Sequence, residues 1–256
     1  MLEVVGVVLL LAALGGLAWW LLIETEGVYL GRRVVIWLYD VYARRYDSIK
    51  DFQPEYEFVL LAVPIMSAID PQRDPMVLDV ATGTGRLPLA LLRHARFEGR
   101  VVGVDLSTQM LHIAADKMAE DNAWVDLLCA PAEELPFHEA VFDVVTCLES
   151  LEFMRDQSQV LAEIARVLRP GGVLLITNRI NTRWMPGQTL NDTTLSDLLR
   201  EHGFVGVQIE PWQEDYNRVW ARKVGESQPH GAVSLWSVVN RPLHTVYVDD
   251  AGIVHI

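Results

Sequence analysis

Two hydrophobic patterns divide the chain. Val4–Ile23 contains no charged residue, whereas from residue 76 onward short apolar runs alternate with segments of helical periodicity. An apolar run of about 20 residues predicts a helix roughly 30 Å long, which matches the hydrocarbon thickness of a bilayer. The alternating part predicts repeated strand–helix units, and therefore a parallel, doubly wound sheet.

The strand segments are continuous runs of Val, Leu and Ile, which is typical of strands covered by helices on both faces. The expected strands are 76–80, 101–105, 124–129, 142–147, 173–178, 205–210 and 218–224. The expected helices are 87–95, 108–119, 157–168 and 195–204, with Pro170 and Gly171 ending the third. The predicted fold class is α/β: a Rossmann-like, mostly parallel, seven-stranded sheet, preceded by one transmembrane helix.

The N-terminal apolar run has two other interpretations. A cleaved signal peptide would have a basic start and a small-residue cleavage site, but this run begins Met-Leu-Glu and ends with Trp19, Trp20 and Glu24. A buried core helix would need protein on every side. Paired tryptophans suit a membrane interface, so the transmembrane interpretation is favoured.

Basic residues follow this run, and none precedes it. Those between residues 24 and 50 are Arg32, Arg33, Arg44, Arg45 and Lys50. Because basic flanks stay in the cytoplasm, the pattern predicts a single-pass membrane protein with its main domain on the cytoplasmic side. Residues 28–49 mix arginines with aromatic residues, which is typical of a helix in the headgroup layer or of an amphipathic helix packed on the domain.

The amino-acid composition limits the kinds of binding partner that the chain can have. The chain has a net charge of −13, and 51% of its residues are hydrophobic. An acidic surface repels phosphate backbones, so we expect no nucleic-acid partner. Cys129 and Cys147 lie in separate apolar runs and form no metal-ligand pair, so no metal site is predicted.

The first expected strand leads directly into a glycine loop, LDVATGTGR (78–86). Glycines in such a loop let a ligand approach the backbone, and the next helix offers free N–H groups. Asp105 ends the second expected strand, where a carboxylate can accept both hydroxyls of a ribose. Dinucleotide-binding loops need a third glycine, but Pro88 stands in that place, which argues against a pyrophosphate.

The chain here resembles the class I S-adenosylmethionine (SAM)-dependent methyltransferases, especially the branch of ubiquinone and menaquinone C-methyltransferases. The resemblance covers about residues 40–224. It rests on six segments in the family's order and spacing: YARRYD (42–47), LDVATGTGR (78–86), VVGVDLSTQML (101–111), APAEELPF (130–137), FDVVTC (142–147) and LRPGGVLLI (168–176).

The resemblance implies a set of cofactor-binding residues. Asp79 and the backbone of Ala81, Thr82, Gly83 and Gly85 would hold the methionine part of SAM. Asp105 would bind the ribose, Leu106 and Met110 would flank the adenine, and Ala132 and Glu133 would lie along its edge. Two departures stand out: Ala81 replaces a glycine found in many relatives, and the segment LESLEF (148–153) lacks a histidine that many relatives carry.

Methyl transfer from a sulfonium requires alignment and exclusion of water more than acid–base chemistry. If a base is needed, the weak candidates are Glu149, Glu152 and Tyr46. Membrane attachment favours a lipid-like acceptor, such as a quinone precursor or a lipid, over another small molecule. A nicotinamide-dependent oxidoreductase and a degenerate SAM-binding domain with a structural role at the membrane remain the alternatives.

These expectations divide the chain into four parts. Residues 1–23 form the transmembrane helix, and residues 24–75 form a juxtamembrane and N-terminal helical segment. Residues 76–225 form the SAM-binding methyltransferase domain. Residues 226–256 form a C-terminal extension, in which HTVYVDDAGIVHI is typical of a hairpin around residues 249–252.

Overall fold

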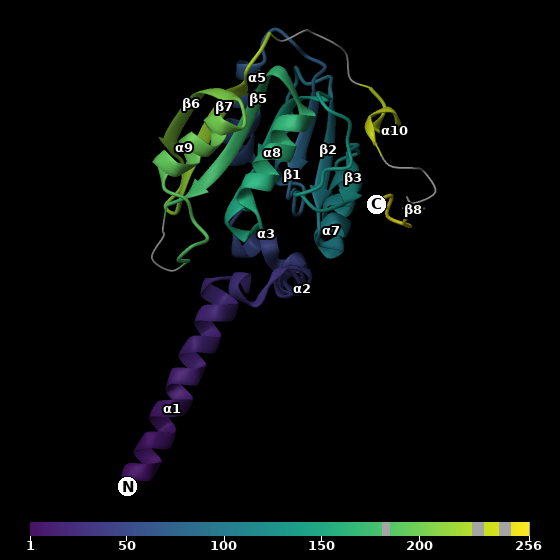
Figure 1. The fold of residues 1–256 in the computed structure, drawn as a ribbon. Coiled ribbons are helices and arrows are strands. Elements are labelled where there is room, and N and C mark those ends of the chain that lie inside the picture. Colours follow the sequence, from purple (N-terminus) through teal and green to yellow (C-terminus); the bar gives the residue numbers. More distant parts are fainter. Residues whose placement is uncertain (181–184, 227–232, 241–246, 256) are drawn as a thin grey trace.

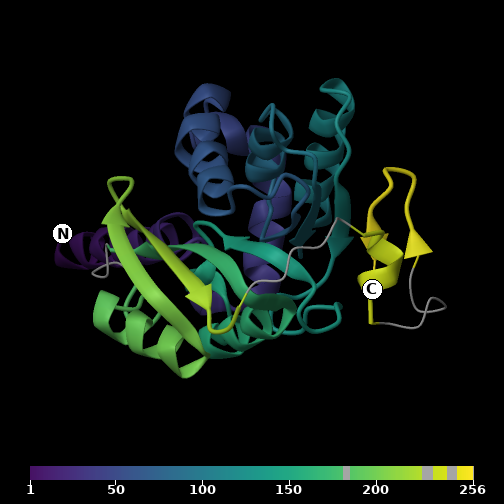
Figure 2. The same ribbon diagram turned by 90° about the horizontal axis from the view of Figure 1, so that it is seen from above.

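A twisted nine-stranded sheet forms the centre of the computed structural model, which describes residues 1–180, 185–226, 233–240 and 247–255 (Figures 1 and 2). The strand order is β6-β7-β5-β4-β1-β2-β3-β9-β8. The strands are β1 Met76–Val80, β2 Arg100–Asp105, β3 Asp126–Cys129, β4 Phe142–Cys147, β5 Leu168–Arg179, β6 Phe204–Pro211, β7 Tyr216–Lys223, β8 Tyr247–Val248 and β9 Val254–His255.

The sheet is mixed but mostly parallel. Strands β1 to β5 pair in parallel, whereas β7 pairs antiparallel with both β5 and β6. The sheet has two more strands than the seven expected, because the C-terminal hairpin of β8 and β9 pairs in parallel with β3 through β9. Its turn lies at residues 249–252, as expected, and Gly252 has a φ of +81° there. Residues 244–246 and 256 of the expected hairpin lie outside the described part of the chain.

Helices cover both faces of the sheet. Alternate residues of β1 show why: Met76, Leu78 and Val80 pack in one core, and Val77 packs in the other. The first core lies under α8 Gln157–Val167, α9 Asp192–Glu201 and α10 Leu235–Val238. The second lies under η4 Phe58–Ala62, α5 Val63–Ala68 and α6 Arg86–Leu92, while α7 Thr108–Glu120 packs beside β3.

Strand β5 differs from the sequence prediction. The third helix ends at Val167, as the Pro-Gly pair predicted, but the strand begins at Leu168 rather than Val173. Leu168 pairs with Phe142, and the regular register then resumes with Val173 opposite Val144. The Pro-Gly residues therefore form an irregularity within a strand, which requires a long-range pairing that the local sequence does not reveal.

The N-terminal helix extends away from the body of the molecule (Figure 1). It runs through α1 Leu2–Trp19 and the wider turn η1 Trp20–Glu24. The segment Glu3–Glu24 is long and apolar enough to cross a bilayer, with a mean hydropathy of 2.3, and none of its most apolar window is buried. The alternative of a buried core helix is therefore wrong.

A broken helical segment connects this helix to the sheet. It contains η2 Val28–Leu30, α2 Arg32–Tyr42, η3 Ala43–Arg45, α3 Tyr46–Ile49 and α4 Pro54–Glu57. Helix α2 packs on the domain beside α7, with Leu38 buried and Trp37 exposed. This supports the interpretation of an amphipathic helix packed on the domain, and it leaves one side of α2 free for other contacts.

Candidate functional site

The glycine loop joins the end of β1 to α6 in a strained conformation. Ala81, Gly83 and Gly85 all have left-handed backbone angles, with φ values of +56°, +54° and +77°. The Thr82 N–H donates to the carbonyl of Val104 at 3.0 Å, which ties the loop to the end of β2. The loop therefore lies across the carboxyl ends of the first two strands, where ligands bind in open α/β sheets.

The two glycines serve different purposes. A Cβ at Gly83 would meet no atom within 4 Å, so the backbone there is open to a ligand. A Cβ at Gly85 would lie 2.8 Å from the Met118 side chain and 3.2 Å from Ala114. Gly85 thus allows the close packing of α7, and its predicted contact with a cofactor stays a prediction.

Ala81 adopts a backbone conformation that favours glycine. We expect Ala81→Gly to raise the free energy of unfolding by up to about 1 kcal/mol, because relief of a left-handed alanine outweighs the added entropy of the unfolded chain. Ala140, with a φ of +52°, is a matched control away from the loop. Denaturant unfolding should show similar gains for both variants, whereas tighter SAM binding is expected for Ala81→Gly alone. Weaker SAM binding by Ala81→Gly would contradict this account of the loop.

Asp79 is buried at the end of β1. Its two carboxylate oxygens accept hydrogen bonds from the hydroxyls of Thr82 at 2.7 Å and Thr146 at 2.6 Å. Burial raises the pKa of Asp79 to about 6, against the lowering effect of these two hydroxyls. The residue is therefore mostly ionised at neutral pH, beside the place where the resemblance puts the cationic methionine part of SAM.

The raised pKa of Asp79 has a consequence for stability. The folded protein binds a proton at this carboxyl below about pH 6, whereas the unfolded chain binds it only near the ordinary value of 3.8. The contribution of this carboxyl to the free energy of unfolding is therefore fully present below pH 3.8. It is lost as pH rises through about 6, because the folded protein must then hold a buried charge. We expect Asp79→Asn to be more stable than the parent at pH 7.5, by up to about 3 kcal/mol, with a gap that closes toward pH 4. Thermal unfolding across this range would show a constant gap if the account were wrong.

Asp105 joins the glycine loop to the start of α7. One carboxylate oxygen accepts from the Gly83 N–H at 2.9 Å, and the other accepts from the Ser107 N–H at 2.8 Å. Burial raises the pKa of Asp105, and the backbone N–H groups oppose the rise. Helix α7 is capped by the hydroxyl of Ser107 itself, which accepts from the Met110 N–H. Each Asp105 oxygen has a further lone pair for a ligand hydroxyl.

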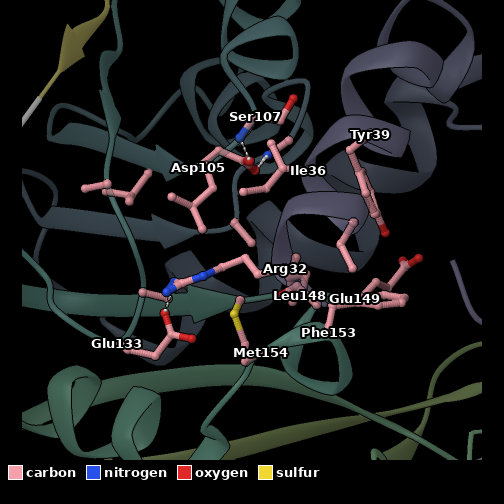
Figure 3. A pocket seen from close by; sticks show the side chains of 18 of the residues that line it. Arg32, Ile36, Tyr39, Asp105, Ser107, Glu133, Leu148, Glu149, Phe153 and Met154 are labelled. Carbon is pink, nitrogen blue, oxygen red and sulfur yellow. Dashed lines mark hydrogen bonds and ion pairs between the residues drawn. The ribbon is translucent and has the colours of Figure 1, made fainter. Parts of the chain in front are cut away.

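A cavity opens beside these residues (Figure 3). Eight of the residues predicted from sequence line it: Tyr46, Ala81, Gly83, Asp105, Leu106, Ala132, Glu133 and Glu149. Asp79 and Thr82 line a smaller adjoining cavity that shares Gly83 with the first. Gly85, Met110 and Glu152 line neither of the two. The Met110 side chain is buried, so the structure gives no support for its predicted place beside the adenine.

The N-terminal segment covers the cavity. Arg32, Ile36 and Tyr39 of α2 line it, a set that sequence reasoning missed although their spacing of about one helical turn places them on one face. Asp40 accepts from the Ser107 hydroxyl at 2.6 Å. Asp47 of the YARRYD segment accepts from the Lys117 ammonium at 2.6 Å and from the Thr84 hydroxyl at 2.5 Å. These bonds hold α2 and α3 against α7 and the loop.

An ion pair crosses the edge of the cavity. The Arg32 guanidinium lies 3.0 Å from a carboxylate oxygen of Glu133, as Figure 3 shows, and the Arg155 N–H also donates to Glu133. The Glu133 side chain is only 15% exposed. Glu133 therefore faces the site rather than bulk solvent, and it links the segment before the sheet to the loop after β3.

Glu149 is held by cations. Its carboxylate lies 2.6 Å from the Arg86 guanidinium and 3.8 Å from the Lys50 ammonium, and it also accepts from the Gln213 amide. Arg86 is bound on its other side by Glu57. Glu149 thus serves to order the site.

The other two candidate bases are poorly suited. Burial raises the pKa of Tyr46 well above its ordinary value, so its hydroxyl keeps its proton at neutral pH. Burial raises the pKa of Glu152, but this carboxyl accepts from the Tyr216 hydroxyl, lies 3.8 Å from Arg179 and lines neither cavity. In the described part of the chain, no group of three or more His, Cys, Asp or Glu side chains is placed to hold a metal ion.

Comparison with known proteins agrees with this geometry. Residues 78–176 match the family model of methyltransferase domains. The ubiquinone/menaquinone biosynthesis C-methyltransferase UbiE of Geobacter sulfurreducens is 34% identical over 142 residues, which cover 51% of this chain and 56% of that protein. The chain spans about half the length of the curated relatives it matches.

Solved structures show the same fold. A SAM-dependent methyltransferase from Aquifex aeolicus gives a TM-score of 0.52 at 20% identity, over 68% of this chain and 100% of that one. The [4+2]-cyclase SpnF gives a TM-score of 0.55 at 23% identity, over 64% and 80%. Residues 78–176 therefore match a family of methyltransferase domains whose methyl donor is SAM, and the chain is distantly similar to UbiE.

Proposed function

We propose that this chain is a membrane-anchored SAM-dependent methyltransferase that acts on an apolar, lipid-like acceptor. The observation that carries the proposal is the cavity at the carboxyl ends of the first two strands, where open backbone at Gly83 faces the cavity beside the Asp105 carboxylate. An open loop and a carboxylate at neighbouring strand ends fit the two ends of a nucleoside cofactor.

The residues present fit SAM. The Asp105 carboxylate would hold the ribose hydroxyls, the Gly83 backbone would lie along the methionine part, and Leu106 and Ala132 would contact the adenine. When bound, SAM supplies a methyl group on a cationic sulfur, so the leaving group needs no acid. The chain's own contribution is alignment and exclusion of water by α2, which covers the cavity. Tyr46 keeps its proton at neutral pH, Glu149 is paired with Arg86, and Glu152 does not line the cavity. This arrangement favours an acceptor that is nucleophilic without prior loss of a proton.

Binding measurements test the cofactor. We expect calorimetric titration of the full chain to show binding of SAM and S-adenosylhomocysteine and no binding of NADH. The buried Pro88 in α6 stands where a dinucleotide loop needs its third glycine. Binding of NADH without binding of SAM would reject the proposal in favour of an oxidoreductase.

Three features support membrane attachment. The N-terminal segment Glu3–Glu24 is strongly apolar, and none of its most apolar window is buried. Trp37 is 58% exposed on α2, on the side that does not cover the cavity. Arg33, Arg44 and Arg45 are exposed in the same segment, where they would meet anionic headgroups on the cytoplasmic side.

Removal of the helix tests this attachment. We expect the full chain to stay in the membrane pellet after carbonate extraction, and a protein beginning at Glu24 to become largely soluble. Glu24 is the preferred start because Glu26 accepts a hydrogen bond from the Tyr39 hydroxyl at 2.6 Å and should be kept. Unchanged SAM affinity in the shortened protein is the control for folding. Release of the full chain by carbonate would reject the anchor.

A SAM-binding domain that performs no methyl transfer is the second candidate. The fold is shared with a protein described as a [4+2]-cyclase, so the fold by itself does not define the reaction. The loop also contains Ala81 in a position that favours glycine. Binding of SAM without any transfer of its methyl group would identify this candidate.

A further inference from the structure

A second cavity lies at the junction between the N-terminal helix and the domain. It measures about 320 Å³, within the usual range for a ligand site. Leu22 and Ile23, from the last turn of the N-terminal helix, form one side, and Leu38, Tyr42 and Ile49, from α2 and α3, form the other. We call this cavity the junction groove. Its walls are therefore mainly apolar and begin where the proposed membrane helix ends.

Two tyrosine rings separate the junction groove from the cofactor cavity. Tyr39 and Tyr46 line both spaces. Their ring centroids are 5.8 Å apart with an angle of 46°, and Tyr39 also meets Phe153 edge-on at 6.0 Å. We call these two rings the wall. Because they line both spaces, a molecule in the groove would lie beside the cofactor cavity.

The wall is linked to the N-terminal helix. The Tyr39 hydroxyl donates to a carboxylate oxygen of Glu26 at 2.6 Å. Glu26 follows the end of that helix by two residues and has a left-handed φ of +47°. This bond fixes the Tyr39 ring relative to the helix end. The position of the anchor and the position of the wall are thus coupled.

The charges around the junction groove favour an uncharged occupant. Lys50 lines the groove, but its ammonium lies 3.8 Å from Glu149 and 5.9 Å from the centre of the Tyr46 ring. Glu26 is bound to Tyr39. The Lys50 ammonium is thus already close to a carboxylate, and the Glu26 carboxylate would repel a phosphate headgroup. Aromatic rings at the inner end instead suit a flat, uncharged head, and the aliphatic outer end suits a hydrocarbon chain.

We infer that the junction groove binds the hydrocarbon chain of an acceptor dissolved in the bilayer and admits its uncharged head to the cofactor cavity past Tyr39 and Tyr46. The inference rests on the proposed function and adds the route and the class of acceptor. The lining of the groove includes both Ile23, which is 51% exposed on the helix, and the two rings. A bilayer-dissolved acceptor would thus reach the site without passing through water.

Two matched variants test the inference. Ile49→Glu places a charge in the junction groove at a residue that is 59% exposed, so the fold should tolerate it. Val41→Glu places the same charge at a residue of nearly equal exposure, 58%, that does not line the groove. Both charges lie in the same segment, so a general disturbance of membrane contact should affect the two variants alike.

The first measurement uses a probe of known chemistry. The full chain in phosphatidylcholine vesicles is exposed to a fatty alcohol that carries a photoactivatable diazirine, and the labelled peptides are mapped. We expect label between residues 38 and 50 in the parent and in Val41→Glu, and a loss of about tenfold in Ile49→Glu. Label confined to the N-terminal helix, or equal loss in both variants, would overturn the inference.

The second measurement separates the inference from the proposed function. Affinity for S-adenosylhomocysteine should stay within about twofold in both variants, since neither residue lines the cofactor cavity. Transfer of labelled methyl groups into extracted lipid should fall about tenfold in Ile49→Glu alone. Full transfer by Ile49→Glu would reject the groove as the route. Absence of cofactor binding in the parent would instead reject the proposed function.

Discussion

Replacement of Gly83 by alanine is expected to weaken SAM binding by about tenfold to a hundredfold, because the added methyl group would enter the space of the cofactor. The expectation follows from the open space around a Cβ at this position and from the place of Gly83 in both adjoining cavities. A left-handed φ of +54° adds a cost in stability as well. Binding and stability must therefore be measured separately.

Gly206 provides the matched control. It has a φ of +64°, a Cβ there would also meet no atom within 4 Å, and it lies in β6, away from the cofactor cavity. Gly206→Ala should lose about as much stability as Gly83→Ala, about 1 kcal/mol, with no change in affinity. Calorimetry with S-adenosylhomocysteine would measure the affinity of both variants, and thermal unfolding would measure their stability. Equal affinity in Gly83→Ala and the parent would mean that the loop is a structural turn and that the site assignment fails.

The substitution Asp105→Ala is expected to weaken the binding of SAM by about tenfold to several hundredfold. Hydrogen bonds to a charged group contribute about 1.5–3 kcal/mol each. Asp105→Asn should lose less, because one acceptor remains. Stability should fall too, since this carboxylate accepts from the Gly83 and Ser107 N–H groups. A lower melting temperature is therefore expected whether or not Asp105 binds the ribose.

A ligand change isolates the ribose contact. S-adenosylhomocysteine that lacks the ribose 2′-hydroxyl should bind the parent more weakly, and Asp105→Ala should then cost less affinity than it does for the complete ligand. Asp40→Ala is the control for damage at the start of α7, because Asp40 accepts from Ser107 and does not line the cavity. The same loss for both ligands in Asp105→Ala would show that Asp105 acts only through the loop.

The central strands could be predicted from the sequence because each is buried on both faces. The run 76–80 coincides with β1, and 142–147 coincides with β4. The start of β5 and the pairing of β9 with β3 could not be predicted, because both depend on partners far along the chain. Local hydrophobic patterns identify a strand but do not specify its neighbours.

The candidate site was predictable where the strand ends determine it. Asp105 is the last residue of β2, the glycine loop follows β1, and parallel strands bring their carboxyl ends together. The close packing of α7 against Gly85 could not be predicted, because it depends on Ala114 and Met118 more than 25 residues away. The cover from α2, with Arg32 and Tyr39, comes from a segment more than 30 residues before β1. Its helical pattern predicted an amphipathic helix but not the surface on which it packs.

Transfer of a labelled methyl group tests the central claim most directly. The full chain would be incubated with methyl-labelled SAM and vesicles made from lipid extracted from cells that carry this gene, with Asp105→Ala as the matched variant. We expect label to enter the lipid phase in proportion to time and protein, with at least about a tenfold loss in Asp105→Ala at limiting SAM. Binding of SAM by the parent with no label above background in lipid, water-soluble products or protein would contradict the claim.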